Sequence, residues 1–480
     1  MNLMDYLSAA PEMTLLGLIC VVLIADLFVD SEHRVLTFWM SMAALAITAW
    51  VVLATAPDGR VVVFDGSYVS DPLSQILKIS AVGFVAVAFL YARDYLLAND
   101  LHKGEYYTLG LFGLLGMMIM ISANSLLIMY LGVETLALSM YALVAIDRNN
   151  VTSAESAMKY FVLGAIASGA LLYGISWIYG VTGTLKFDEI ATAVAANPAL
   201  NSLPLWFGLA FLIVGIAFKF GAVPFHMWLP DVYQGARTPV TLYLATAPKL
   251  AALAFALRVL VDGLGGLHDV WADMIMVVAV LSLLAGNVIA IAQTNIKRML
   301  GYSTIAHVGF ILLGVFCGTQ KGNAASLFYT LTYIVAAAGA FGIVILLSRR
   351  GFDAENISDF KGLNARSPWF ALMMMFLMFS MAGVPPFIGF FGKLNVIDAV
   401  LSAGFPGLAV LMVLASVVGA YYYLRVIWYM YFEQGEDQAV LQASTDTRLV
   451  LSLNGVAVLA LGIVPGWLWT LCSQIALSMR

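Results

Sequence analysis

The chain has 480 residues, of which 62% are hydrophobic and only 11% are charged, and its mean hydropathy is +0.94. Soluble domains carry roughly 25% charged residues, so this composition excludes an ordinary soluble protein and indicates a polytopic membrane protein. The net charge is −5 without a basic cluster, which excludes the usual kind of nucleic-acid-binding protein. Cys20, Cys317 and Cys472 lie far apart and form no metal-binding or disulfide pattern. With no glycine-rich nucleotide motif either, we expect this chain to bind no metal and no cofactor.

The apolar runs predict an all-α membrane protein with about fourteen transmembrane helices. The N-terminal segment MNLMDYLSAAPE lacks the basic start of a signal peptide, so the first run is expected to be a span. At about 20 residues per span, the expected helices lie at 12–30, 35–55, 72–92, 106–122, 124–146, 153–180, 203–228, 239–262, 271–292, 298–317, 324–348, 368–403, 406–432 and 449–472. The twelfth is too long for one crossing and is expected to be broken.

Lysine and arginine placement orients these spans. If the N-terminus faces outward, twelve of the 23 basic residues fall in cytoplasmic loops, four fall outside and seven lie within spans. This bias agrees with the positive-inside rule and predicts that both termini face outward. The twelve are Arg34, Arg93, Lys103, Arg148, Arg237, Lys297, Arg298, Arg349, Arg350, Lys361, Arg366 and Arg448, and the four are Arg60, Lys186, Lys321 and Arg480.

Several titratable residues lie inside the expected spans. An ammonium in hydrocarbon costs at least ~2.5–3.5 kcal/mol on insertion scales, so an intramembrane lysine predicts a function. A row of such groups in a helical membrane protein indicates proton movement. The residues are Lys78, Glu134, Lys159, Lys219, Lys249 and Lys393.

Three pairs of similar segments predict an internal repeat. The pairs are 129–143 with 298–312, 220–226 with 381–387, and 255–261 with 422–428, at offsets of 169, 161 and 167 residues. Five spans separate the members of each pair, and because five is odd the two copies are expected to be inverted, as in many transporters. Chance similarity between Leu/Ala/Gly-rich helices is the alternative. The expected division of the single membrane domain 1–480 is a three-helix extension 1–105, a first repeat 106–262, a second repeat 271–432 and a C-terminal helix 449–480.

Proline and glycine predict breaks in the seventh and twelfth spans. Gly221 and Pro224 interrupt the seventh, while the run AGVPPFIG interrupts the twelfth. Proline removes a backbone donor and clashes with the preceding turn, and in lipid such breaks occur only beside protein or a water-filled cavity. A purely structural kink is the alternative, but Lys219 and Lys393 each lie beside a break.

The runs FKFGAVPFHMWLPDVYQGARTPVT, APKLAALAFALRV, QTNIKRMLGYSTIAHVGF and AGVPPFIGFFGK resemble the antiporter-like subunits of respiratory NADH:quinone oxidoreductase, complex I. The resemblance extends from about residue 70 to 430, and the family also includes large subunits of multisubunit Na⁺/H⁺ antiporters. Within the family the chain resembles the N-type subunits, because it has Lys393 where M-type subunits carry glutamate and leaves no room for the lateral helix of L-type subunits. Arg237 departs from the family pattern.

The resemblance implies a role for each membrane lysine. Glu134 and Lys219 would form the carboxylate–lysine pair of a first half-channel, Lys249 the central relay and Lys393 the terminal residue of the second half. Lys159 would be a modulating or connecting lysine of the proton path. The alternatives are a structural ion pair for Glu134 and, for Lys159, an ammonium that reaches back to the interface.

Other polar residues of the spans carry weaker predictions. His307 lies mid-span and is a candidate proton relay, or alternatively a hydrogen-bonded histidine of the bundle. His226 follows the first break and either relays protons or caps freed carbonyls. Lys78 is expected to reach the interface, and Arg258 and Arg425 are expected to anchor equivalent spans at the cytoplasmic interface.

Taken together, the residues and the resemblance predict a proton-translocating subunit without a redox centre, driven by quinone reduction elsewhere in a complex. NADH, FMN, Fe–S clusters and quinone are expected in other subunits, and the expected neighbours are the M-type subunit and the small K- and J-type subunits in a bacterial inner membrane. The alternatives are a subunit of a Na⁺/H⁺ antiporter, and a structural scaffold that must explain the buried ionisable groups.

Overall fold

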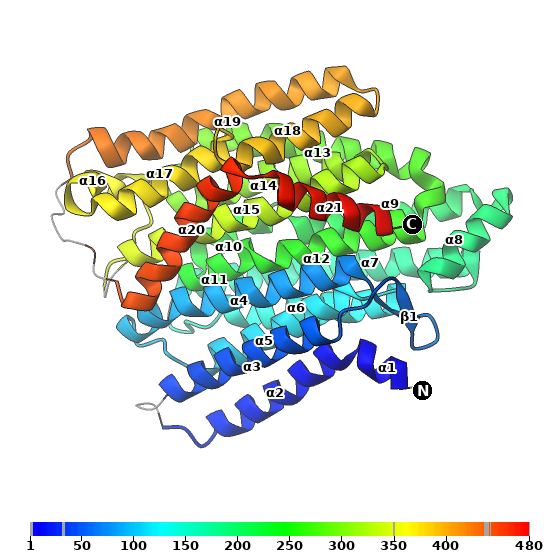
Figure 1. Ribbon diagram of the computed structural model, residues 1–480, viewed down its shortest axis with the longest axis horizontal. Helices are drawn as coiled ribbons and strands as arrows, with labels where there is room; N and C mark the ends of the chain where they lie inside the picture. The colour runs from blue at the N-terminus through cyan, green and yellow to red at the C-terminus, as the bar shows by residue number, and fades with distance from the viewer. Residues whose placement is uncertain (1–2, 31–33, 349–350, 436–440, 442, 480) are drawn as a thin grey trace.

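A computed structural model describes residues 3–30, 34–348, 351–435, 441 and 443–479. Arg349, Arg350 and Arg480, three of the basic residues counted above, lie outside this part of the chain. The helices run side by side along one direction, and both termini lie at the same end of the bundle, together with α8 (Phe187–Ala196) and β1 (Val61–Val63) (Figure 1). β1 pairs with β2 (Tyr68–Ser70) in an antiparallel hairpin.

The expected spans are present. Within the described residues, twelve helices are long and apolar enough to cross a membrane. They are α3 (Val35–Ala54), α4 (Pro72–Ala98), α5 (Gly104–Ile121), α6 (Leu126–Val144), α7 (Val151–Thr182), α9 (Leu203–Phe220), the segment Thr238–Gly263, the segment Gly265–Ile291 with α13 (His268–Ile291), α14 (Ile296–Phe316), α15 (Gln320–Leu347), α19 (Pro406–Phe432) and α20 (Thr445–Ile463). The 17-residue α2 (Ala10–Asp26) and the interrupted pair α17 (Pro368–Ala382) and α18 (Ile388–Ser402) account for the other two expected spans.

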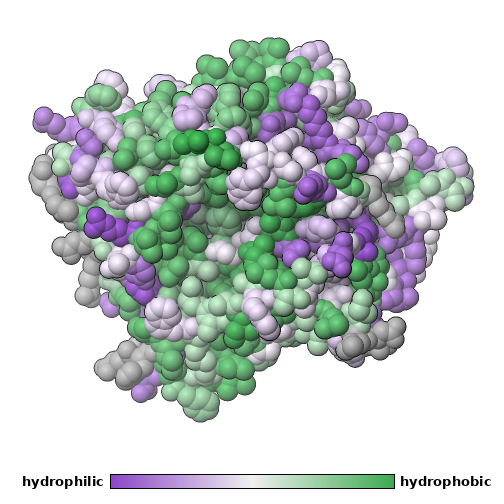
Figure 2. All heavy atoms as spheres, in the orientation of Figure 1, coloured by the Kyte–Doolittle hydropathy of each residue, from purple (hydrophilic) through white to green (hydrophobic). Residues whose placement is uncertain are grey.

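Shorter elements connect or extend these spans. They are α1 (Leu3–Ser8), η2 (Pro198–Leu200), α10 (Trp228–Gly235), η4 (Gly265–Leu267), η5 (Ile357–Phe360), α16 (Leu363–Arg366) and α21 (Gly466–Ser478). Figure 2 shows apolar side chains over much of the middle of the molecule, while hydrophilic side chains gather toward the end that carries α8 and β1. An apolar belt with polar ends is the surface that a bilayer requires.

Both predicted breaks are confirmed. α9 ends at Phe220, where Gly221 adopts the left-handed conformation with φ 74°, and α17 ends at Ala382, where Gly383 has φ 87°. Glycine accepts this conformation because it has no Cβ. Each break also contains a cis peptide bond before a proline, Val223–Pro224 in the first and Pro385–Pro386 in the second.

A third interruption was not predicted. The eighth expected span, 239–262, divides at Thr246, whose φ of −113° and ψ of −98° separate α11 (Thr238–Ala245) from α12 (Ala247–Ala256). Pro248 follows in the first turn of α12, where its missing N–H is tolerated. The span then ends in the π-helix η3 (Leu257–Gly263), a form that occurs frequently at functional sites.

The C-terminal segment also differs from the single helix expected over 449–480. α20 ends at Ile463 and α21 begins at Gly466, with Pro465 between them. The residue before a proline is pushed out of the helical region, and Val464 has φ −126° and ψ 65°. The division 1–105, 106–262 and 271–432 stays a prediction.

The breaks correct the register of the repeat. The left-handed Gly221 and Gly383 are 162 residues apart, and so are Pro224 and Pro386 of the two cis bonds. The sequence comparison gave 161 for this pair of segments, which is wrong by one residue. Apolar side chains of similar size tolerate a one-residue slip in an alignment, whereas a left-handed glycine fixes the equivalent backbone position.

The helix starts give a second correction of the same kind. Ser125 caps α6 and Asn295 caps α14, and each also forms an antiparallel bridge, to Lys186 and to Asn356 respectively. The two caps, Ser125 and Asn295, are 170 residues apart, and so are their bridge partners, Lys186 and Asn356. The sequence comparison predicted an offset of 169 residues. The first bridge adjoins α8 and the second leads into η5 and α16, at opposite ends of the bundle (Figure 1). The two copies are therefore inverted, as predicted.

Candidate functional site

Lys219 lies in the last turn of α9, where it is partly buried. Its ammonium donates to the carbonyl of Val133 on α6 at 3.3 Å. The next residue, Glu134, instead accepts a 2.5 Å hydrogen bond from Ser168 of α7, whose hydroxyl also lies 3.0 Å from that of Tyr130. Among the described residues, ion pairs within 4.0 Å do not include Glu134 with Lys219. The two groups are neighbours but are not in contact in this structure.

Lys159 is not buried, in contrast to the expectation for a residue within an apolar span. Its side chain is 46% exposed and forms ion pairs with Glu155 at 2.8 Å and with Asp231 of α10 at 3.1 Å. The Asp231 carboxylate also binds Arg298 of α14 at 2.6 Å. Lys159 is therefore held by two carboxylates, while its modulating role and its reach toward the interface stay predictions.

Lys249 occupies the interior of the bundle. It follows the interruption at Thr246, is 1% exposed, and donates at 2.7 Å to the carbonyl of Phe220, the last residue of α9. Lys219 and Lys249 both line a small cavity of ≈ 20 Å³ together with Tyr160. This volume holds about one water molecule. The structure therefore brings the lysine of the first break and the central lysine to the same cavity.

His226 lies within the first break, between α9 and α10, and is partly exposed. Its Nδ1 is buried and makes no hydrogen bond within 3.5 Å to the described residues. The backbone of Pro224 in the same break nevertheless interacts with the imidazole, so relay by His226 and capping of a freed carbonyl both stay predictions.

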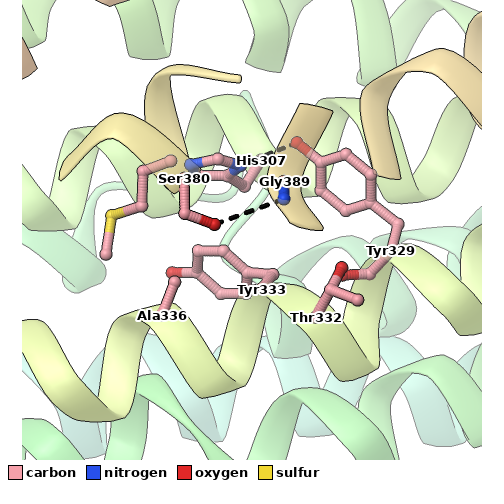
Figure 3. A pocket seen from close by; sticks show the side chains of 8 residues that line it. His307, Tyr329, Thr332, Tyr333, Ala336, Ser380 and Gly389 are labelled. Atoms are coloured by element: carbon pink, nitrogen blue, oxygen red, sulfur yellow. Dashed lines mark hydrogen bonds between the residues drawn. The ribbon is translucent and has the colours of Figure 1, made fainter. Parts of the chain in front are cut away.

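His307 lies in the middle of a chain of hydrogen bonds. Its Nδ1 is 2.7 Å from the hydroxyl of Tyr329, and its Nε2 is 2.8 Å from that of Tyr423, which also hydrogen-bonds Ser303. Tyr333 packs against the imidazole with a centroid distance of 4.6 Å. Figure 3 shows His307, Tyr329 and Tyr333 beside a cavity of ≈ 10 Å³, near the lower limit for one water. His307 thus has a hydroxyl at each ring nitrogen.

Lys393 occupies the second break as Lys249 occupies the first. Its ammonium donates at 2.8 Å to the carbonyl of Ala382, the last residue of α17, and lies 5.5 Å from the ring centroid of Phe310. Phe310 in turn stacks on Tyr329, the partner of His307. Lys249 and Lys393 therefore each bind the last carbonyl of a half-helix. Such C-terminal ends carry partial negative charge and favour cations.

Lys78 does not reach the interface as predicted. It is 3% exposed and forms an ion pair with Glu12 of α2 at 2.7 Å. The Tyr68 hydroxyl accepts from Lys78 and donates to Glu12, each at 2.8 Å. The prediction failed because the partner carboxylate lies far away in the sequence and only folding brings it near.

Arg258 does not anchor the chain at the cytoplasmic interface either. It is fully buried, binds both carboxylate oxygens of Asp71 at 2.7 and 2.8 Å, and binds Asp262 at 2.9 Å. Its repeat equivalent, Arg425, donates to backbone carbonyls of Ile291 and Gln293. Because the repeats are inverted, the two arginines lie at opposite ends of the bundle, and only one of them can face the cytoplasm.

The sequence reasoning missed four polar residues that contact the predicted ones. They are Ser168, Asp231, Tyr329 and Tyr423. The available signal was a hydroxyl or carboxylate within an apolar span, which alone does not distinguish a site residue from a hydroxyl that bonds its own helix.

A family model described as NADH:quinone oxidoreductase/Mrp antiporter, TM, matches residues 123–419. The NADH-quinone oxidoreductase subunit N of Thioalkalivibrio sulfidiphilus is 54% identical over 469 residues, covering 98% of each chain. The subunit N of Alkalilimnicola ehrlichii is 52% identical over 469 residues, covering 98% of this chain and 96% of the other.

Solved structures agree with these relatives. A chain of respiratory complex I from Thermus thermophilus is 31% identical, with a TM-score of 0.82 and coverage of 96% of this chain and 98% of that one. A chain of the Mrp complex from Dietzia sp. has a TM-score of 0.84 at 22% identity, covering 100% and 98%, which shows a shared fold alone. The whole-length relatives assign the protein: the chain belongs to the family of antiporter-like N subunits of NADH-quinone oxidoreductase, complex I.

Proposed function

We propose that this chain, as a membrane subunit of complex I, translocates protons through Glu134, Lys219, Lys249, His307 and Lys393. The supporting observation is the equivalent placement of Lys249 and Lys393, each buried and bound to the last carbonyl of a half-helix. Half-helix ends at a repeat centre are where transporters hold their coupling ions. A lysine there can bind or release a proton without any metal.

The first half of the path begins with Glu134 and Lys219, which are not in contact in this structure. A carboxylate that approaches an ammonium stabilises its charged form, and withdrawal removes that stabilisation. Glu134 bound to Ser168 is the withdrawn arrangement. Lys219 then releases its proton, and one water in the cavity shared with Lys249 completes the transfer to the central lysine.

The second half uses the hydroxyls around His307. A neutral imidazole accepts a proton on one nitrogen and releases one from the other, and Tyr329 and Tyr423 supply a partner at each. Ser380 and Gly389, which lie on either side of the second break, line the same cavity as His307 and support a path from there toward Lys393. We assign Lys159 a modulating role and His226 an accessory one.

The energy for this transfer comes from quinone reduction by NADH in other subunits, which hold the FMN, the Fe–S clusters and the quinone. This chain supplies no redox group, and its neighbours are the M-type subunit and the small K- and J-type subunits of a bacterial inner membrane. The excess of basic residues in odd-numbered loops supports periplasmic termini. The alternative of a Na⁺/H⁺ antiporter subunit is less supported, because the relatives that are 52–54% identical over almost the whole length are complex I subunits, whereas the Mrp chain is 22% identical.

The test uses Lys249→Ala in the assembled complex in sealed membrane vesicles. We expect normal assembly but at least about tenfold lower pumping and coupled turnover, since positioned proton-transfer groups contribute about a hundredfold or more. The matched control is Lys321→Ala, which removes a lysine from an exposed ion pair with Asp398. A normal number of protons moved per electron in Lys249→Ala would overturn the relay.

A further inference from the structure

Asp231 joins the two repeats. One of its oxygens binds Lys159 on α7 at 3.1 Å and the other binds Arg298 at the start of α14 at 2.6 Å. Gln234 accepts from the same guanidinium nitrogen at 3.2 Å. α7 belongs to the first predicted repeat, whereas α14 belongs to the second and carries His307. A single carboxylate therefore connects a cation of each half.

The corrected offset between the repeats identifies the residue of the second repeat that is equivalent to Asp231. At the offset of 162 residues that relates Pro224 to Pro386, Asp231 is the equivalent of Lys393. Both lie in the helix that follows a break, α10 in the first repeat and α18 in the second. The position that holds a buried lysine in the second half thus holds a carboxylate in the first.

We propose that Asp231 is a positioning residue that couples the two halves of the proton path, an inference that rests on the function proposed above. Arginine keeps its charge at all physiological pH values, so Arg298 maintains a carboxylate at Asp231. The ammonium of Lys159 forms ion pairs both with that carboxylate and with Glu155, which lies at 2.8 Å. A change in the charge or position of Lys159 alters how tightly α10 holds the start of α14, and this links the first half to the helix of His307.

A purely structural role for the ion pairs of Asp231 predicts a different experimental result. These side chains are 29–46% exposed in this chain, and exposed ion pairs contribute little to stability. If Asp231 only ties three helices together, its loss reduces the amount of assembled complex but not the protons moved per electron in the complexes that remain. The ratio of protons to electrons therefore separates the two roles.

The experiment measures assembled complex, turnover and this ratio in sealed vesicles for Asp231→Asn, Asp231→Glu and Arg298→Gln. We expect Asp231→Asn to assemble normally while coupled turnover falls by about fivefold or more, as is typical when two sites lose their coupling. The ratio should fall as well. Asp231→Glu should recover most of both, and the double variant with Arg298→Gln should lose no more than either single variant.

Asp398→Asn is the matched control, because it removes a carboxylate from an exposed ion pair with Lys321 at 2.7 Å. It should behave as the unmodified complex. An unchanged ratio in Asp231→Asn, or additive losses with Arg298→Gln, would overturn the coupling role. If Lys249→Ala lowers the ratio in the same vesicles while Asp231→Asn does not, only the present inference fails. If Lys249→Ala leaves the ratio normal, the proposed function fails.

Discussion

Replacement of Lys78 by methionine tests how far a buried ion pair stabilises the N-terminal helices. Methionine keeps the length of the side chain but removes the ammonium, which leaves the carboxylate of Glu12 buried at 8% exposure with Tyr68 as its hydrogen-bond partner among the described residues. Removal of one partner of a buried pair costs about 3–5 kcal/mol, because the other charge is left uncompensated.

One feature of the site reduces that cost. The Tyr68 hydroxyl still donates to Glu12 at 2.8 Å, and a hydrogen bond to a charged group contributes about 1.5–3 kcal/mol. Because this hydrogen bond remains, we expect Lys78→Met to destabilise the protein by about 3 kcal/mol, the lower end of the range for a broken buried pair.

The assay heats the purified complex in steps and measures how much intact complex remains on a native gel. Lys78→Met should lower the temperature of half-loss, whereas the double variant with Glu12→Gln should restore most of it because no charge stays unpaired. Lys186→Met is the matched control, since this lysine pairs with carboxylates at an exposed site and its loss should change little. A Lys78→Met complex as stable as the unmodified one, or a double variant no better than the single, would refute the reasoning.

Two further predictions concern the proton path. Glu134→Gln and Lys219→Ala should each lower pumping by about tenfold, and the double variant should lose no more than either because the two residues act as one unit; additive losses in sealed vesicles would show that they act separately. Lys393→Arg should assemble but pump about tenfold more slowly, because a guanidinium does not release its proton. If arginine supports full pumping, Lys393 only satisfies the carbonyl of Ala382 and lies outside the path.

The features that sequence reasoning placed correctly are those that local chemistry determines. A break follows from Gly and Pro within an apolar run, and the structure has one at Gly221 and one at Gly383. The inverted repeat followed from an odd number of spans between similar segments. The interruption at Thr246 was missed because Pro248 lies in the first turn of α12, where proline is compatible with a continuous helical pattern.

Pairing across the bundle could not be predicted in the same way. Lys78 of α4 and Glu12 of α2 meet beside Tyr68 of β2, and Arg258 meets Asp71 across 187 residues of chain. A single sequence gives no information about which of several carboxylates lies next to a given cation. The same limitation applies to Glu134, for which the expected partner was Lys219 and the observed one is Ser168.

Lys249 and Lys393 bind equivalent half-helix ends, but they do not occupy equivalent sequence positions in the two repeats. Lys393 belongs to α18, the second half of its own broken span, whereas Lys249 comes from α12, in the span after the break that it occupies. Both nevertheless donate to the last carbonyl of the first half-helix. A cation is favoured there by the half-helix dipole and the unpaired carbonyls, whichever helix supplies it. The repeat therefore conserves the end of the half-helix as a place for an ammonium, and the lysine position in the sequence is free to differ between the halves.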